Sequence, residues 1–488
     1  MKSSSSNVTK SINSSRSHYI HCLIGFALMF IFWVIPPINC ITPLGMRVVG
    51  ILLCTLYLWT TVDTIWPSFV GILFLGISGF APMNSVITTT FGNPLAILLM
   101  YVIILTGAIS EEGICEYVSR WFVTRKIING RPWMFSLMLL LGVYLLATLT
   151  MATATIFMFW PILYSLFQVL DLKKEDKYTT LMLISVVMVA TLSFASTPFK
   201  SILPGLLNSF KEVTGSNIEY LPYMFVGTCI SLVSILGIIL LMKYVFKPDV
   251  SKLKNIHTDM FNQNPLPPMN TRQKVLIGLV GIFILWMLVP SLLPEGPIRT
   301  FLNSTQNASP ILCIALGGFL KIDGRPLIPF AKITSKYMSW PVFLMVASSN
   351  SILNALTSEQ TGVTPFLQSA LMPIFEGKSV LAFTVLIMVI CIIITNLCNN
   401  IVVGMLFIPI INIFASQNSI SPIPMGIIML FVVCLALVTP ASSALGAALH
   451  SNQEWLQVKD IYKYTIIMSL LTLIVAFVVG LPLLNLIF

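Results

Sequence analysis

The chain has 488 residues, of which 57% are hydrophobic and 9% are charged, and its mean hydropathy is +0.93. A soluble globular protein carries roughly 25% charged residues to cover its surface, so this composition excludes that class. The net charge of +10 comes from 27 basic and 17 acidic residues, and in so apolar a chain it reports orientation in a membrane rather than nucleic-acid binding.

Long apolar runs predict an all-α polytopic membrane protein, because a helix needs about 20 apolar residues to cross a bilayer. In the first half we expect helices near 18–38, 42–60, 64–82 and 92–110, a broken pair across 133–170, and helices near 178–208 and 222–245. In the second half we expect helices near 274–293, 309–320 and 338–356, a broken pair across 379–416, and helices near 422–450 and 464–486. The chain then divides into a tail with the first helix (1–41), a first repeat (42–246), a cytoplasmic linker (247–273) and a second repeat (274–488).

The basic residues indicate on which face of the membrane each connection lies. If both broken pairs enter and leave on one side, a single face holds 22 of the 27 basic residues, in the connections near 1–17, 111–132, 171–177, 243–274, 321–337 and 451–463. Four basic residues lie on the other face, and Lys200 lies within a helix. The positive-inside rule therefore predicts eleven crossings, with the N-terminus in the cytoplasm and the C-terminus outside. We expect the plasma membrane as the location.

Two segments share a pattern of small and polar residues, an apolar run and a Pro-Ile pair. They are Thr150–Ile162 and Cys398–Ile410, and each precedes a long apolar helix interrupted by Thr-Pro, at Thr197-Pro198 and at Thr439-Pro440. The predicted topology opens the first broken pair to the cytoplasm and the second to the exterior. The two halves therefore form an inverted repeat.

Helix breaks within a membrane have a physical meaning, because backbone groups freed from helical bonding must line a cavity or be buried in protein. Half-helix N-termini offer a positive dipole and free N–H groups to an anion, while hydroxyls and carbonyls coordinate a cation. The alternative is that proline only kinks a packed helix and that threonine bonds to its own backbone. A matched pair of breaks in inverted halves favours a binding site.

Several segments, in their order along the chain, resemble the divalent anion–sodium symporter family, which includes citrate and dicarboxylate carriers. They are Trp59–Pro67, Phe91–Pro94, Gly107–Gly113, Trp340–Asn350 and Glu359–Gly362, together with both Thr-Pro breaks. The resemblance implies re-entrant hairpins at the two broken pairs, an elevator-like motion of a transport domain against a scaffold, a homodimer and a small carboxylate substrate.

The family carries a Ser-Asn-Thr triplet at each hairpin tip, and this chain departs from it at both. The first triplet becomes Met151-Ala152-Thr153, and the second becomes Asn399-Asn400-Ile401. The resemblance implies substrate contacts from Thr153, Thr197, Pro198, Asn400, Thr439 and Pro440. It implies that a sodium ion, the one cofactor to consider, lies near Ser196, Thr395, Asn399 and Asn400. The altered triplets leave sodium coupling open.

Lys200 joins the expected substrate-binding residues for a different reason. It lies three residues after Thr197, inside a predicted membrane helix, where a lysine costs about 2.5–3.5 kcal/mol on the insertion scale and faces a cavity or a partner. We hypothesise that its ammonium replaces the charge of the sodium ion lost with the altered first tip, beside the substrate carboxylate. The alternative is that Lys200 reaches an interface or pairs with an acid.

Three other features have simpler interpretations. Asp63 is either a proton-coupling carboxylate or, more simply, a cytoplasmic loop acid. The charged stretch from Glu111 to Arg125 predicts a solvated or headgroup-facing surface. His450 ends an inner helix, where a capping or interface role is expected.

We therefore predict a secondary active transporter of small carboxylate anions, in the first place dicarboxylates, working by alternating access. The alternatives are a carrier of another anion or a neutral solute, a sodium-independent exchanger and, in a different class, an anion channel. We expect no enzyme, because the sequence shows no clustered membrane carboxylates, His pair or nucleophile beside a base. The expected partners are a small anion, the lipid bilayer and a second copy of the chain.

Overall fold

The computed structural model describes residues 3–123, 125–200, 202–255, 267–305, 308–338, 340–363, 365–366, 369, 379–397, 400–439 and 442–488. Over these residues the chain is helical apart from one two-stranded β-hairpin, so the predicted all-α class is confirmed. By length and apolar composition, seven of the described segments could cross a membrane: Met83–Glu111, Pro132–Leu149, Ala152–Val169, Lys177–Ser196, Tyr220–Phe246, Thr271–Leu288 and Val458–Ile487. Shorter apolar helices accompany them, so the chain is a polytopic membrane protein. The count of eleven crossings stays a prediction.

The first half begins with α1 (Ser3–Val34), α2 (Pro43–Thr61), α3 (Ile65–Ile77), α4 (Met83–Phe91), α5 (Pro94–Glu111) and α6 (Ile114–Val123). After a 3-10 turn (Lys126–Ile128) follow α7 (Pro132–Leu149), α8 (Ala152–Val169), α9 (Lys177–Ser196), α10 (Leu203–Thr214) and α11 (Tyr220–Leu240), which continues as a π-helical turn (Leu241–Phe246). Proline in the first turn of α2, α7 and α10 suits a helix start, where its missing N–H group is not needed.

The second half contains α12 (Thr271–Leu288), α13 (Pro297–Thr305), α14 (Ser309–Phe319), the strands β1 (Lys321–Ile322) and β2 (Arg325–Pro326), α15 (Phe330–Tyr337) and α16 (Trp340–Thr357). Then come α18 (Val380–Thr395), α19 (Asn400–Gln417), α20 (Ile423–Val433), α21 (Ala444–Ser451) and α22 (Val458–Val475), which a π-helical turn (Ala476–Gly480) joins to α23 (Leu481–Ile487). Short 3-10 turns lie at Lys252–Asn255, Val289–Leu292 and Glu359–Thr361. The strands pair antiparallel, with Lys321 opposite Pro326.

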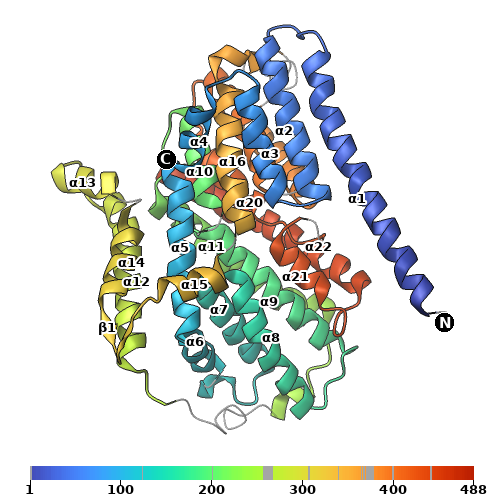
Figure 1. Cartoon of the computed structure of the whole chain (residues 1–488). Helices are drawn as coiled ribbons and strands as arrows, with labels where there is room; N and C mark the ends of the chain where they lie inside the picture. The colour runs from blue at the N-terminus through green and yellow to red at the C-terminus, as the bar shows by residue number, and fades with distance from the viewer. Residues whose placement is uncertain are drawn as a thin grey trace.

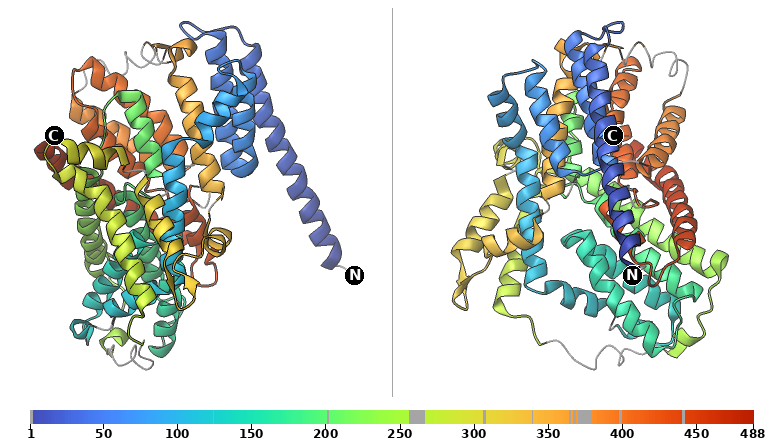
Figure 2. Two further views of the ribbon diagram at one scale, coloured as in Figure 1. Left: turned by 60° about the vertical axis from the view of Figure 1, so that its left-hand side comes forward. Right: turned by 45° about the vertical axis from the view of Figure 1, so that its right-hand side comes forward.

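The helices differ from the sequence-based expectation in several places, and α6, α13 and α15 lie in segments where we expected no helix. We expected the first helix to begin near residue 18, but α1 begins at Ser3, because no proline or glycine interrupts the chain before Gly25. The N-terminal part of α1 stands apart from the other helices (Figures 1 and 2). We expected a connection between the third and fourth helices, where the structure has α4, separated from α5 by the turn from Gly92 to Asn93.

The two halves pack reciprocally around their broken helices. Both helices of the first hairpin, α7 and α8, pack on α9, and both helices of the second hairpin, α18 and α19, pack on α20. The helix that follows each break packs on the other half of the chain: α10 packs on α19, and α21 packs on α8. In Figure 1 α9 lies below α10, whereas α20 lies above α21, so the two broken helices run in opposite directions. The right-hand view of Figure 2 shows α7 and α8 low and α18 and α19 high in the molecule.

Burial is greatest along the two central helices. α9 is buried along almost its whole length, and in α20 every residue from Met425 to Val433 is buried. These helices share one large hydrophobic cluster with both hairpins, whereas α5, α12 and α14 contribute to a second, smaller cluster. The breaks that follow α9 and α20 therefore start deep inside protein, as freed backbone groups in a membrane require.

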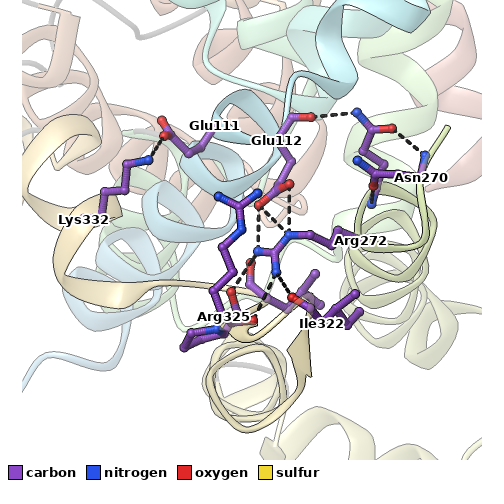
Figure 3. Close-up of polar contacts among 10 residues, drawn as sticks. Glu111, Glu112, Asn270, Arg272, Ile322, Arg325 and Lys332 are labelled. Carbon is purple, nitrogen blue, oxygen red and sulfur yellow. Dashed lines mark hydrogen bonds and ion pairs between the residues drawn. The ribbon is translucent and has the colours of Figure 1, made fainter. Parts of the chain in front are cut away.

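A buried ion pair fixes the end of α5, as Figure 3 shows. Arg272 Nη2 lies 2.8 Å from Glu112 Oε1, and the two side chains are only 1% and 9% exposed. The guanidinium also donates to the carbonyl oxygens of Ile322, Arg325, Pro326 and Leu327. The network ties α5, the first turn of α12 and the β-hairpin together.

This network corrects the expectation of a solvated or headgroup-facing surface at Glu112, whereas Glu116 in the same charged stretch is exposed, as expected. The Glu112 carboxylate is buried because Arg272, 160 residues later, supplies both a charge and a two-pronged donor. The neighbouring Glu111 carboxylate lies 2.6 Å from Lys332 Nζ and 2.8 Å from Lys336 Nζ, which attaches α15 to the same end of α5. This end of α5 is therefore anchored from two sides.

Candidate functional site

A cavity of about 190 Å³ lies at the tip of the first hairpin. It is lined by Val102, Ile103 and Thr106 of α5, by Ala147, Thr150, Met151, Ala152 and Thr153 around the tip, and by Phe194, Lys200, Val342, Ala444 and Leu445. Four of these residues have polar side chains, three threonines and Lys200. The cavity is therefore an apolar chamber with few, closely placed polar groups, a pattern typical of a small-molecule site.

Two helix N-termini meet at this cavity. Ala152 and Thr153 open α8, and Ala444 and Leu445 open α21. The first N–H groups of a helix have no partner within the helix, and the helix dipole makes that end positive. The Ser443 side chain caps α21 by accepting a hydrogen bond from Gly446 N. This cap does not involve the N–H groups of Ala444 and Leu445, the first two residues of α21. The positive ends of two half-helices, one from each half of the chain, thus face one chamber.

Lys200 supplies a full positive charge at the same wall. Its side chain is buried, with 8% exposed, and its Nζ donates to Ala147 O and Thr148 O, both at 2.7 Å, and to Thr150 O. These carbonyls belong to the last turn of α7 and the turn that follows it. Lys200 is also among the residues that line the chamber, so its side chain borders this space directly.

The residues just before Lys200 bond within the protein rather than into the cavity. Ser196 Oγ lies 2.8 Å from Tyr144 Oη, and Thr197 Oγ1 donates to Ser193 O at 2.8 Å. Pro198 is buried in the break between α9 and α10. Thr197 thus bonds to its own helix, as the simpler interpretation of a Thr-Pro pair expects, yet α9 ends at Ser196 and the next helix, α10, begins at Leu203.

The second break is organised by Asn396, at the end of α18. Its Oδ1 accepts hydrogen bonds from Leu437 N at 2.9 Å and Val438 N at 2.8 Å, and its Nδ2 donates to Ile392 O at 2.7 Å and Leu435 O at 3.2 Å. Thr439 Oγ1 completes the contact by donating to Asn396 O at 2.7 Å. One buried amide therefore satisfies four backbone groups of the second tip and its break.

The other predicted residues of the second tip surround this amide. Thr395 Oγ1 donates to Val433 O at 2.7 Å, so its hydroxyl hydrogen is directed at the end of α20. Asn400 is buried at the start of α19. Asn399 and Pro440 lie outside the described residues. Among the predicted residues, Thr153 and Lys200 line the cavity, and Thr395 and Thr439 hold the second break. The other described ones do neither: Ser196, Thr197 and Pro198 lie at the end of α9 and in its break, and Asn400 begins α19.

Sequence reasoning missed Asn396 and Thr106. Asn396 lies three positions before the aligned triplet, so the family pattern did not single it out. Thr106 lines the cavity from α5, although its hydroxyl donates to Val102 O and Ile103 O of its own helix. An isolated threonine in an apolar run has no sequence signal that separates these roles.

Asp63, which we considered for proton coupling, and His450, for which we expected a capping or interface role, both have local partners. Asp63 is exposed, and its carboxylate accepts hydrogen bonds from Thr64 N and Ile65 N at the start of α3, which fits a loop acid. His450 is buried in the last turn of α21, where its Nε2 lies 2.9 Å from Val438 O and its ring packs on Tyr462. His450 thus supports the second break from the far end of the following half-helix.

Comparison with known families identifies one match. A family model described as citrate transporter, CitMHS, matches residues 54–324, which is more than half of the chain and includes the first hairpin, the first break and Lys200. No curated protein matches the chain. The chain therefore belongs to the citrate transporter family, within the divalent anion–sodium symporter group whose segments it resembles.

Proposed function

We propose that this protein is a secondary transporter of small carboxylate anions and that the cavity at the first hairpin tip binds the substrate. The observation that carries the proposal is the convergence of the buried Lys200 ammonium with the N-termini of α8 and α21 on one chamber. Membership of a citrate transporter family supports a carboxylate as the substrate class.

The charge at the chamber favours an anion with two carboxylates. Lys200 contributes one unit, and each half-helix N-terminus contributes about half a unit, for a nominal total of about +2. The negative end of α7 subtracts about half a unit, which still leaves more charge than one carboxylate neutralises. Apolar walls such as Val102, Phe194 and Val342 lower the local dielectric, which strengthens these attractions. Succinate-like dianions are therefore the first substrates to test, with citrate second.

The origin of the cavity walls supports alternating access. Some of the lining residues come from α5 and α16, and others come from the first hairpin, Lys200 and the start of α21. On the α5–α16 side the lining side chains are Val102, Ile103, Thr106 and Val342. A wall of this kind holds the substrate with few polar bonds, so the hairpin body can carry the anion past it in an elevator-like motion.

Uptake of labelled succinate and citrate into proteoliposomes tests the proposal. Thr153→Val removes a hydroxyl that lines the chamber. The matched control is Thr384→Val in α18, where the hydroxyl donates to Val380 O of its own helix and the residue is not part of the lining. We expect the first variant to raise the KM for the anion and the second to leave it unchanged. Equal uptake by both variants and the wild type would contradict the assignment of the cavity.

The same vesicles distinguish the remaining alternatives. An inward sodium gradient compared with choline tests symport, internal succinate tests exchange, and saturation with counterflow separates a carrier from a channel. We also propose a plasma-membrane location with the N-terminus in the cytoplasm, supported by the 22 basic residues on one face. A homodimer is proposed on the family resemblance, and light scattering of the purified protein tests it.

A further inference from the structure

We propose that the Lys200 ammonium is a built-in cation of the first hairpin tip, occupying a cage of three backbone carbonyl oxygens that a dissociable monovalent cation would otherwise fill. The tip is then held in its anion-binding shape without a soluble cation. The inference deepens the proposed function, because it assigns the charge on which anion binding at this tip depends, and it rests on that function for its transport readout.

The cage lies where a helix ends inside the protein. The last carbonyl groups of a helix have no partner within it and form its negative end. At the end of α7, Ala147 O and Thr148 O each lie 2.7 Å from Lys200 Nζ, and Thr150 O accepts from the same nitrogen. These three oxygens, among the partners of Lys200, thus converge on one positive centre, and an ammonium group can donate to all of them.

Such a cage does not select an ammonium on chemical grounds. Backbone carbonyls of interrupted membrane helices also coordinate alkali cations, because they replace the ion's hydration shell. The Lys200 ammonium differs from an alkali cation in that it is covalently part of the chain and cannot dissociate from the site. Neutralising these carbonyls lets the α7 end approach the anion chamber, where their negative potential would otherwise oppose a carboxylate.

The break between α9 and α10 holds Lys200 in place from the other side. Lys200 N lies 3.3 Å from Thr197 O, and Leu203 N lies 3.2 Å from Lys200 O, so the residue forms part of a compact turn. The adjacent Phe199 packs edge-on against Phe283 of α12, with the ring centres 5.6 Å apart. The second hairpin makes the corresponding tie to its break through the neutral amide of Asn396. A permanent charge is thus a feature of the first tip.

The test replaces the ammonium with empty space or with an uncharged chain of similar length. In Lys200→Ala the carbonyl cage loses its cation but keeps room for one, whereas in Lys200→Met an apolar side chain fills the same room. The purified variants and the wild type are compared in choline, sodium, potassium and methylammonium chloride, by thermal unfolding and by succinate uptake into proteoliposomes. Lys211→Ala, which removes an exposed lysine from α10, is the matched control.

We expect wild-type stability and uptake to be the same in sodium and in choline. Lys200→Ala should lose at least tenfold in uptake in choline and regain stability and uptake in at least one of the small cations. Lys200→Met should stay inactive in every salt, and Lys211→Ala should behave as the wild type. Wild-type uptake or stability that requires sodium would overturn the proposal, as would a Lys200→Ala variant indifferent to all cations.

Two outcomes separate this inference from the proposed function. If the wild type moves no carboxylate but Lys200→Ala is stabilised by a small cation, the cage is real and the substrate assignment is wrong. If Lys200→Ala does not fold in any salt, the wild type still tests the proposal. A built-in cation requires the stability and the uptake of the wild type to be the same in sodium as in choline. Full uptake by Lys200→Met would show that no charge is needed at this tip.

Discussion

Replacing Arg272 with methionine should strongly destabilise the protein, because the change leaves the Glu112 carboxylate charged and buried. The two side chains are 1% and 9% exposed, so water cannot replace the lost partner without opening the structure. Breaking a buried pair by removing one partner costs about 3–5 kcal/mol. The four carbonyl oxygens that accept from the guanidinium lose their charged donor as well. We expect a loss at the upper end of that range.

The double variant Arg272→Met with Glu112→Met separates the two contributions. It removes the orphaned charge but leaves the carbonyls of the β-hairpin without the guanidinium, so a residual loss of about 1–3 kcal/mol should remain. Equilibrium unfolding in mixed detergent micelles measures both values. Lys332→Met is the control. The Lys332 side chain, which pairs with Glu111, is 59% exposed, and such surface pairs contribute about 0–1 kcal/mol to stability.

The reasoning would be refuted if Arg272→Met lowered the free energy of unfolding by less than about 1 kcal/mol. It would also fail if the double variant were less stable than Arg272→Met alone, since removing a buried unpaired carboxylate can only relieve the penalty that the single change creates. Either result would mean that Glu112 is neutral or hydrated in the folded protein.

The remaining predictions concern a close packing contact, the second break and a charged surface pair. Gly45→Ala would place a Cβ atom 2.0 Å from Thr361 O, so the free energy of unfolding should fall by about 1–3 kcal/mol, while Gly278→Ala, which meets nothing within 4 Å, should not destabilise the protein. Asn396→Ala removes four hydrogen bonds to the backbone and should lower succinate uptake at least tenfold. The control Asn418→Ala, whose amide donates to Phe414 O of the preceding helix α19, should keep wild-type uptake. A hydrogen bond to the Glu111 carboxylate raises the pKa of Lys336. Any stability that comes from the protonated lysine is therefore fully present at a pH below the ordinary lysine pKa of about 10.4. It is lost only as the pH rises through the higher pKa that Lys336 has in the folded protein. Unfolding midpoints of the wild type and Lys336→Met should therefore differ by the same amount from about pH 6 to 9, and high salt should reduce the difference; a change across that pH range would contradict the assignment.

The first hairpin tip could be predicted because its signals are local. The small and polar residues from Thr150 and the Thr-Pro pair mark two interruptions of apolar helices, although Pro161 itself lies inside α8, and a lysine inside such a run must face a cavity or a partner. Thr153 and Lys200 both line the same chamber. What the pattern could not provide is the identity of the lysine's partners, because backbone carbonyls leave no trace in a sequence.

The second tip and the end of α5 were harder for physical reasons. Asn396 lies outside the aligned triplet, and the sequence does not separate an amide that satisfies a broken backbone from one that faces water. Arg272 reads as one more base in a polar linker, and its burial depends on Glu112, 160 residues away. Pairings over such distances follow from the packed fold and not from local pattern.

The reciprocal packing of the two halves bears on how the chain is made. The chamber is lined by residues from Val102 to Leu445, so most of the chain must be synthesised and inserted before its last wall is in place. Until α21 arrives against α8, the first hairpin has an open side next to the buried lysine. A nascent chain that ends before residue 444 therefore lacks one wall of the chamber, on the side where α21 would cover α8.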